Sequence, residues 1–292
     1  MKSWEKNIRR VEPYVPGEQP QEANIIKINT NENPYPPVPG VEKKLNKDMV
    51  ERLRLYPDPT MSSLVKTLAK YQGLKESQIF VGVGSDDVLA MAYLTFFNSN
   101  KPILFPDITY SFYDVWANLY RIPFEQLELD DDFRIVKEDY SRENGGIVIA
   151  NPNAPTSIYE ELDTIRYILD NNQESIVIID EAYIDFGGES AKKLISEYEN
   201  LLVVQTFSKS RSMAGMRIGY AMGNENLIKA LNDVKYAFNS YTLNLPSIIC
   251  GVESINNDDY FKETINKIIE TRQKTMTELE KIGFTFFESK TT

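Results

Sequence analysis

Residues 175–185 read SIVIIDEAYID, and this stretch decides the fold class. Its run from Ile176 to Ile179 is continuously apolar, which is typical of a parallel strand that is covered on both faces. Two carboxylates, Asp180 and Glu181, follow at once, where an open α/β sheet binds its ligands. The stretch therefore predicts a buried strand with a polar site at its carboxyl end.

Short apolar runs and helical patterns alternate along the chain on both sides of this stretch. Strands are expected at 79–83, 101–105, near 124–126, and at 146–150, 175–179 and 201–206. Helices are expected at 61–71, 85–98, 111–120, 159–171 and 191–198. Ser85 or Asp86 is the expected N-cap of the helix at 85–98. This order predicts an α/β fold, a mostly parallel, doubly wound sheet with helices on both faces.

The chain is expected to have three parts. Residues 1–58 are rich in proline and predict an irregular N-terminal arm, and residues 59–245 form the large α/β domain. Residues 246–292 contain a long helix at 259–282 and a strand-like run at 284–287. Because a single strand needs partners on its edges, this last part is expected to be the start of an incomplete small domain.

Composition limits the chemistry that the 292 residues can perform. The absence of His and the single Cys250 exclude Ser-His-Asp and Cys-His catalysis, His-ligated metals and Cys-based zinc sites. The net charge of −11 argues against a broad nucleic-acid-binding face. No apolar run has the length of a signal peptide or a membrane span. We therefore expect a cytoplasmic protein, without a metal, whose acid–base steps use Lys, Tyr, Asp or Glu.

Four segments that follow predicted strands carry the polar residues of a candidate site. They are VGVGSDD at 81–87, NPNAPTS at 151–157, DEAYID at 180–185 and TFSKSRSMAGMRIGY at 206–220. Each alone is also compatible with a helix cap or a plain loop, and Arg211 has no assigned role and is expected to be solvated. Together they fit pyridoxal 5'-phosphate (PLP). A lysine forms the Schiff base, an acid keeps the pyridine nitrogen protonated, and a helix N-terminus with Ser and Arg binds the phosphate.

The chain resembles the fold-type I PLP-dependent aminotransferases, and within them the histidinol-phosphate aminotransferase subfamily. The resemblance covers most of the chain, in segments whose order and spacing match the family. The segments are PYVPG at 13–17, INTNENPYPP at 28–37, YPDP at 56–59, GSD at 84–86, NPNAPT at 151–156, DEAY at 180–183, SK at 208–209 and AGMRIGY at 214–220. The resemblance implies an enzyme of histidine biosynthesis that transfers the amino group of L-histidinol phosphate to 2-oxoglutarate.

The resemblance also implies roles for individual residues. Lys209 would carry PLP as a Schiff base and, once freed, would move the proton at the substrate's Cα. Asp180 would face the pyridinium nitrogen, Tyr183 would donate to the ring's phenolic oxygen, and Tyr110 would stack on the ring. The phosphate would be surrounded by Gly84, Ser85, Asp86, Thr206, Ser208 and Arg217.

A homodimer with composite active sites is implied as well. Tyr56 would reach the cofactor and substrate of the neighbouring subunit. Tyr14 and Asn33 would bind substrate, because they lie in the N-terminal arm that would cover it. The remaining partners would be the small-molecule amino donor and the 2-oxo acid.

Two features depart from the family pattern. The second Asn of the family's Asn-Asn-Pro-Thr-Gly turn hydrogen-bonds the phenolic oxygen, but Ala154 stands there, and Ser157 replaces the Gly. Either Asn153 takes that role or Tyr183 acts alone. Family members also continue for several dozen residues beyond 284–287, and there carry the arginine that pairs with the substrate's acidic group. The resemblance therefore implies a C-terminally truncated chain.

The sequence leaves three hypotheses open. The first is the histidinol-phosphate aminotransferase. The second is another PLP enzyme of the same fold, such as an aromatic or broad-range aminotransferase or an amino-acid-phosphate decarboxylase. The third is a PLP-binding dimeric fragment without turnover.

Overall fold

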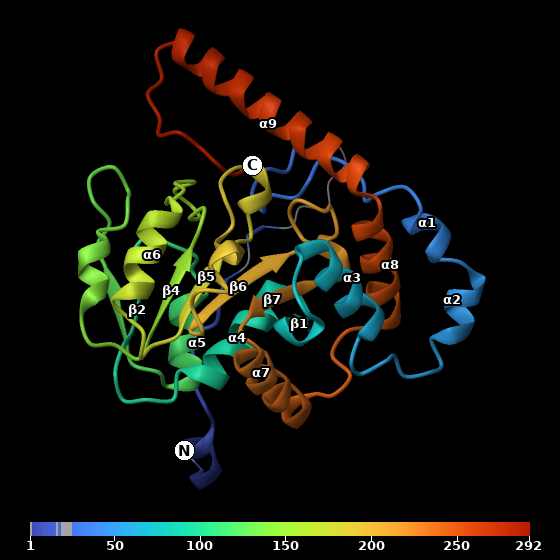
Figure 1. The fold of residues 1–292 in the computed structure, drawn as a ribbon, viewed down its shortest axis with the longest axis horizontal. Coiled ribbons are helices and arrows are strands. Elements are labelled where there is room, and N and C mark those ends of the chain that lie inside the picture. The colour runs from blue at the N-terminus through green and yellow to red at the C-terminus, as the bar shows by residue number, and fades with distance from the viewer. Residues whose placement is uncertain (1, 16, 19–24) are drawn as a thin grey trace.

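The computed structural model describes residues 2–15, 17–18 and 25–292, and it is built on a seven-stranded sheet (Figure 1). The strands in sheet order are β1 (Ile79–Gly82), β7 (Gly219–Gly223), β6 (Leu201–Thr206), β5 (Val177–Asp180), β4 (Gly146–Ala150), β2 (Ile103–Pro106) and β3 (Phe124–Leu127). From β6 to β3 every neighbouring pair is parallel, whereas β7 runs antiparallel to β6 and β1. The predicted mostly parallel α/β fold is confirmed.

Helices cover both faces of this sheet. One face carries α3 (Ser62–Gln72), α6 (Leu162–Asp170) and α8 (Leu245–Asn256), and the other carries α4 (Ser85–Phe96), α5 (Tyr113–Tyr120) and α7 (Glu225–Phe238). The packing of strand β5 explains the apolar run that precedes Asp180 in its sequence. Val177 and Ile179 pack into the core of the first face, and Ile178 packs into the core of the second.

Several predicted elements differ from those in the structure. Strand β7 was not predicted, because its GYAMG sequence has no β-branched run, and α7 and α8 were not predicted either. The helix predicted at 191–198 is a short 3₁₀ turn, Ala191–Leu194. Its first backbone N–H donates to the buried carboxylate of Glu181, 2.6 Å away, instead of beginning a longer helix. Gly84, not Ser85 or Asp86, is the N-cap of α4.

The strand predicted at 284–287 is wrong, because this segment has no regular structure and pairs with no strand. The chain turns at Gly283, and the N–H of Phe284 donates to the carbonyl of Leu279 in the preceding helix. Further on, the N–H of Lys290 donates to the carbonyl of Ser157. The segment therefore bonds to a helix end and a loop, and it joins neither edge of the sheet.

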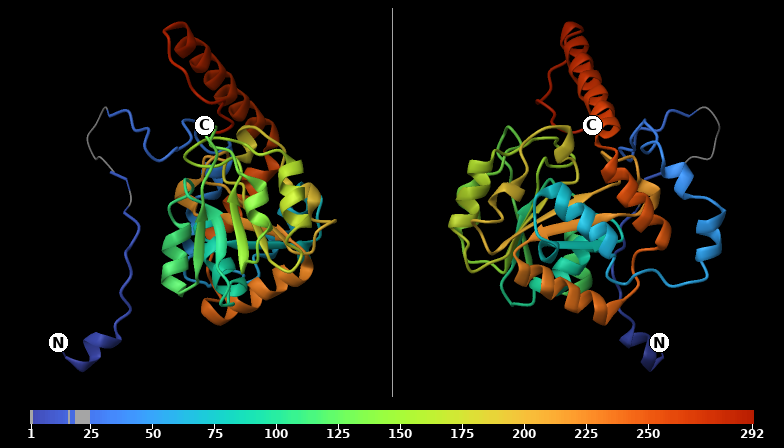
Figure 2. Two further views of the ribbon diagram at one scale, coloured as in Figure 1. Left: turned by 90° about the vertical axis from the view of Figure 1, so that its left-hand side faces the viewer. Right: turned by 45° about the vertical axis from the view of Figure 1, so that its right-hand side comes forward.

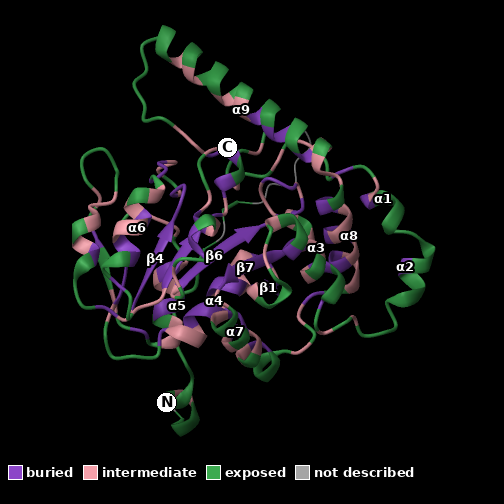
Figure 3. Ribbon diagram, in the orientation of Figure 1, coloured by how far each residue is buried: buried purple, intermediate pink, exposed green. Residues whose placement is uncertain are grey.

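Two segments extend from the body of the molecule. Helix α9 (Asp258–Lys281) buries Phe261, Ile265 and Ile268 in its first half, and its second half projects away from the sheet (Figures 2 and 3). The N-terminal arm runs beside the body and contains the short elements η1 (Ser3–Asn7), α1 (Val41–Lys44) and α2 (Lys47–Arg52). Pro16 of the PYVPG segment, and residues 1 and 19–24 of the arm, lie outside the described residues.

The three-part division at 1–58, 59–245 and 246–292 stays a prediction. Helix α8 begins at Leu245, and its Ile248 and Cys250 belong to the core of the main sheet. Within the described part of the chain, no helix has the length and apolar character needed to cross a membrane.

Candidate active site

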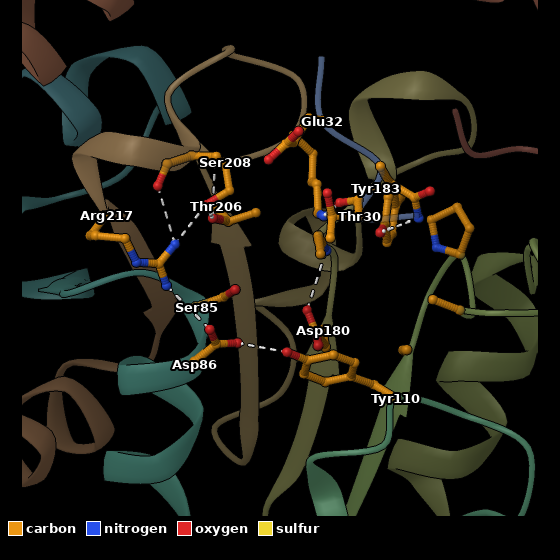
Figure 4. A pocket seen from close by; sticks show the side chains of 17 residues that line it. Thr30, Glu32, Ser85, Asp86, Tyr110, Asp180, Tyr183, Thr206, Ser208 and Arg217 are labelled. Carbon is orange, nitrogen blue, oxygen red and sulfur yellow. Dashed lines mark hydrogen bonds and ion pairs between the residues drawn. The ribbon is translucent and has the colours of Figure 1, made fainter. Parts of the chain in front are cut away.

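The carboxyl ends of the parallel strands surround a cavity of about 210 Å³ (Figure 4). Loops after β2, β4, β5 and β6, the start of α4 and the N-terminal arm all contribute to its wall. The lining residues are Thr30, Asn31, Glu32, Ser85, Asp86, Tyr110, Ala150, Pro152, Ala154, Asp180, Ala182, Tyr183, Thr206, Ser208, Lys209, Ala214 and Arg217. The cavity therefore lies where the fold class predicts a ligand site, and most of the residues expected there line it.

One end of the cavity is built from hydroxyl groups, an arginine and the first turn of α4. The Arg217 guanidinium donates to Ser208 Oγ at 3.4 Å, and Thr206 Oγ1 lies 3.0 Å from Ser208 Oγ. Ser85 is the first residue of α4, so the free N–H groups and the positive end of the helix dipole point to the same place. Such a set of donors is suited to a phosphate group.

Two glycines make this close assembly possible. Gly84 has φ = +84°, and a Cβ on it would lie 2.4 Å from Arg217 Nη2. A Cβ on Gly219 would lie 2.2 Å from the carbonyl carbon of Gly84. Since side chains are excluded at both positions, the backbone of β7 can pack directly against the start of α4 and hold Arg217 there.

Asp86 adds a negative charge at this end. It pairs with Arg217 at 3.2 Å and accepts a hydrogen bond from the Tyr110 hydroxyl at 2.9 Å. Both members of the ion pair are about 40% exposed, at 41% for Arg217 and 40% for Asp86, so the pair itself adds little stability. Burial, and then the nearby Asp86 charge, raise the pKa of Tyr110, so its hydroxyl stays protonated and remains a donor.

Asp180 forms the floor of the cavity at the end of β5. It is 5% exposed and accepts hydrogen bonds from the Tyr113 hydroxyl at 2.9 Å and from the N–H of Ala182 at 3.2 Å. Burial raises its pKa to about 6, although the bond from Tyr113 acts in the opposite direction. A buried carboxylate of this kind favours a cationic partner inside the cavity, such as a protonated ring nitrogen.

Lys209 and Tyr183 face each other across the other end of the cavity. The Lys209 amine donates to the carbonyl of Thr30 at 2.8 Å and lies 5.5 Å from the centroid of the Tyr183 ring. Tyr183 is 8% exposed, and its hydroxyl accepts a hydrogen bond from the Asn31 amide at 2.9 Å. Asn33 Nδ2 donates to the backbone carbonyls of Lys209 and Ser210, so the arm is fixed to the loop that carries the lysine.

Five expected site residues do not line the cavity, namely Tyr14, Tyr56, Asn33, Gly84 and Asn153. Tyr14 stacks on Phe112 with ring centroids 4.2 Å apart, and Tyr56, 82% exposed, packs against Tyr241. Asn33 bonds to backbone, as described above. Gly84 lies just behind the lining and is needed for its shape.

Asn153 is likewise absent from the cavity wall. Its amide nitrogen donates to the carbonyl of Ile108 and to Thr156 Oγ1, and its amide oxygen accepts from Thr109. The methyl group of Ala154 lines the cavity instead. This arrangement gives no support to the hypothesis that Asn153 replaces the missing asparagine.

Thr30 and Tyr113 were missed by the sequence analysis, and Asn31 was expected only as part of the arm that would cover the substrate. Thr30 and Asn31 contact Lys209 and Tyr183, and Tyr113 bonds to Asp180. The position of Asn31 in the NEN motif was a usable signal, whereas a tyrosine at the start of a helix was not.

The donor set fits PLP. A cavity-lining amine, a buried carboxylate and a cluster of phosphate donors match the aldehyde, the ring nitrogen and the phosphate of that cofactor. Among the described residues, no cluster of carboxylate and thiol ligands suited to a metal ion occurs.

The chain is similar to proteins of known family. The family model for aminotransferase class I and II matches residues 23–292. The histidinol-phosphate aminotransferase of Clostridium botulinum (strain 657) is 52% identical over 289 residues, which are 99% of this chain and 82% of the relative. That of Brachyspira hyodysenteriae is 53% identical over 283 residues, which are 97% of this chain and 80% of the relative.

Solved structures show the same fold. A putative histidinol-phosphate aminotransferase from Erwinia carotovora atroseptica has a TM-score of 0.83 and 23% identity, covering 92% of this chain and 80% of that one. The histidinol-phosphate aminotransferase of Sinorhizobium meliloti, solved with PLP, has a TM-score of 0.81 and 21% identity. The match covers 90% of this chain and 72% of that one.

Proposed function

Since the chain belongs to the class I and II aminotransferase family, we propose that it transfers the amino group of L-histidinol phosphate to 2-oxoglutarate in histidine biosynthesis. Its cofactor is PLP. Curated relatives that are 52% and 53% identical over almost the whole chain are named histidinol-phosphate aminotransferases, which supports this donor. The compartment that we propose is the cytoplasm.

One structural observation carries the proposal. Asp180 at the end of β5 and three residues of the β6–β7 segment, Ser208, Lys209 and Arg217, line one cavity. An amine, a desolvated carboxylate and an anion site around one cavity suit a PLP-dependent reaction.

Bound PLP supplies a protonated ring that accepts electron density from the substrate's Cα. Among the described residues, Lys209 has the one amine that lines the cavity, and we assign to it the covalent link to PLP and the proton transfer at Cα. Asp180, held by Tyr113, would keep the ring nitrogen protonated. A carboxylate without water around it interacts strongly with such a cation, because the local dielectric constant is low.

We assign the phosphate to the polar end of the cavity. Ser85, Thr206 and Ser208 would donate hydroxyl hydrogen bonds, and Arg217 would contribute a charge-assisted contact. Asp86 would act through its bonds to Arg217 and Tyr110, which fix the guanidinium and the phenol. Tyr183 would donate its hydroxyl proton to the cofactor's phenolic oxygen, and the ring of Tyr110 would lie against the ring of PLP.

We further propose a homodimer in which Tyr56 completes the site of the partner. The side chain of Tyr56 lies on the surface, away from the cavity of its own chain. Tyr56 packs against Tyr241, and the stretches of chain that carry these two residues have several exposed apolar side chains, as an interaction surface does. They are Leu45, Val50, Leu53, Leu55, Phe238 and Tyr241.

The proposal is tested by titrating the protein with PLP and following the absorbance of the bound cofactor. L-histidinol phosphate is then added, and 2-oxoglutarate after it. We expect a visible absorbance band, its loss with the amino donor, and its return with the acceptor. Lys209→Ala is the control, and it should give no such band.

Failure of L-histidinol phosphate to change the band, with a response to an aromatic amino acid, would contradict the donor assignment. A response to L-histidinol phosphate without return on adding 2-oxoglutarate would contradict the acceptor. Absence of any band in the unaltered chain would contradict PLP binding at Lys209.

A further inference from the structure

We infer that Asn31, in the N-terminal arm, is a positioning residue that orients and strengthens the Tyr183 hydroxyl as a donor into the cavity. The inference rests on the proposed function and extends it to a residue without an assigned role. It starts from one contact, in which Asn31 Nδ2 lies 2.9 Å from Tyr183 Oη (Figure 4).

The direction of this hydrogen bond decides its effect. The Asn31 amide donates, so the Tyr183 oxygen accepts and its own proton is free to point elsewhere. Asn31, Tyr183 and the Lys209 amine all line the same cavity. A phenol that accepts one hydrogen bond is polarised and donates a stronger one, so Asn31 both directs and strengthens the donor.

The backbone of the arm holds Asn31 in this position. Asn31 has φ = +50°, in the left-handed region where Asn is one of the few tolerated residues. Thr30 on one side accepts a bond from the Lys209 amine, and Asn33 on the other donates to the backbone of Lys209. The contacts of Thr30 and Asn33 therefore hold the Asn31 amide beside the Tyr183 hydroxyl.

Within the part of the chain that the structure describes, no other side chain offers the same contact. Among the described residues, Asn31 is the one hydrogen-bond partner of the Tyr183 hydroxyl. The cavity wall also contains Ala154, which packs against the hydrophobic cluster that includes Tyr183 and has no polar side-chain atom. The amide of Asn153 is engaged with Ile108, Thr109 and Thr156. The arm therefore supplies polar support that the 151–157 turn lacks.

The consequence is measurable on bound PLP. A donor at the phenolic oxygen stabilises its negative charge and weakens the attraction of that charge for a nearby proton. Without Asn31, the pH midpoint of the absorbance change of bound PLP should rise by about half a unit to one unit. The dissociation constant for PLP should increase about fivefold, which is typical for one lost hydrogen bond.

The test uses two substitutions that the left-handed backbone at residue 31 accepts. Asn31→Gly removes the amide without strain at positive φ, and Asn31→Asp keeps the size but cannot donate when ionised. The matched control is Asn29→Gly, because the Asn29 amide lies in the same arm and donates to the carbonyl of Glu18. All three are made in the unaltered chain and in a Tyr183→Phe background, and thermal unfolding verifies folding.

The inference predicts that both Asn31 variants raise the pH midpoint and weaken PLP binding, whereas Asn29→Gly leaves both unchanged. In the Tyr183→Phe background the Asn31 variants should have no further effect, since the group through which Asn31 acts is gone. Equal midpoints in the unaltered chain and Asn31→Gly would overturn the inference, and so would a shift that persists without the Tyr183 hydroxyl.

These readouts separate the inference from the proposed function. The pH midpoint and the dissociation constant for PLP are both measured before any amino donor is added. A chain that binds PLP but does not react with L-histidinol phosphate would contradict the proposed donor and leave the Asn31 result valid. A reactive chain with unchanged midpoints in the Asn31 variants would contradict the inference alone.

Discussion

At the scale of single residues, the site depends on groups whose ordinary chemistry is changed by burial. Asp180 ends a strand that is buried on both faces, so its carboxylate is shielded from water. Among the described residues, Tyr113 is its one side-chain hydrogen-bond donor. The sequence predicted a carboxylate at the right place. Its raised pKa comes from the surrounding packing, which no local pattern in the sequence reveals.

Asp180 gives a prediction for the pH dependence of stability in PLP-free protein. Its pKa is about 6 in the fold and near 4 in the unfolded chain, so the folded state binds the proton more tightly. Its stabilising contribution is therefore full below pH 4 and is lost as the pH rises through 6. Relative to Asp180→Asn, we expect the free energy of unfolding to fall by about 2 kcal/mol between pH 4 and pH 7.

Urea unfolding of the two proteins at several pH values measures this difference. The comparison with Asp180→Asn cancels other titrating groups, including Glu181, whose pKa burial raises to about 7. Saturating PLP should remove most of the dependence, because a cationic ring nitrogen favours the ionised carboxylate. A difference that stays constant from pH 4 to pH 7 would rule out this account of Asp180.

At the scale of elements, the loop between β6 and β7 is the part that sequence reasoning described least well. Arg211 was expected to be solvated, and this is wrong, because the side chain is 5% exposed. Its guanidinium lies over the rings of Tyr71, Phe207 and Phe261, and it donates to the carbonyl of Ser254. It therefore connects the loop between β6 and β7, which carries Lys209, to α3, α8 and α9.

Arg211→Ala should destabilise the fold by about 2–4 kcal/mol, because it removes a buried hydrogen bond, cation–π contacts and packing. Arg211→Lys should recover only part of this, since an ammonium lacks the planar surface that stacks on the rings. The free energy of unfolding in urea measures both effects.

Lys193→Ala is the control for the removal of a positive charge. Lys193 makes an exposed ion pair with Glu189, so its loss should cost less than about 1 kcal/mol. If Arg211→Ala cost no more than this control, Arg211 would not be the connection between these elements.

The outcome for the other elements follows the same physical rule. Strands β4, β5 and β6 were predicted because a strand buried on both faces carries a near-continuous apolar run. Strand β7 escaped prediction because its two glycines, of which Gly219 packs against the start of α4, weaken the strand signal. The run at 284–287 has strand-like residues, but a strand exists only where an edge receives it.

At the scale of the whole molecule, the proposed dimer determines whether the site is complete. Tyr56→Phe should weaken PLP binding about fivefold to tenfold, because one hydrogen bond to the phosphate would be lost. Tyr236→Phe is a suitable control, since Tyr236 is also exposed and, among the described residues, its hydroxyl bonds to the carbonyl of Pro59 alone.

A mixing experiment tests whether Tyr56 acts across the interface. In a heterodimer of Tyr56→Phe and Lys209→Ala chains, one site combines an unaltered Lys209 with an unaltered Tyr56. Dissociating and reassociating the two variants together should therefore restore full PLP affinity to a fraction of the sites. No recovery in mixed dimers, or a monomer by light scattering, would contradict the composite site.

The sequence by itself determined the α/β class, the family and the residue types of the site. Apolar runs, loop glycines and the order of short motifs are local features, which can be recognised from the sequence without knowledge of distant contacts. Their partners depend on contacts between distant segments. Only the tertiary structure decided that Tyr113 supports Asp180, that Asn31 rather than Asn153 reaches the Tyr183 region, and that Arg211 is buried. These pairings join residues 43 to 152 positions apart, and folding brings them together through packing that no single segment encodes.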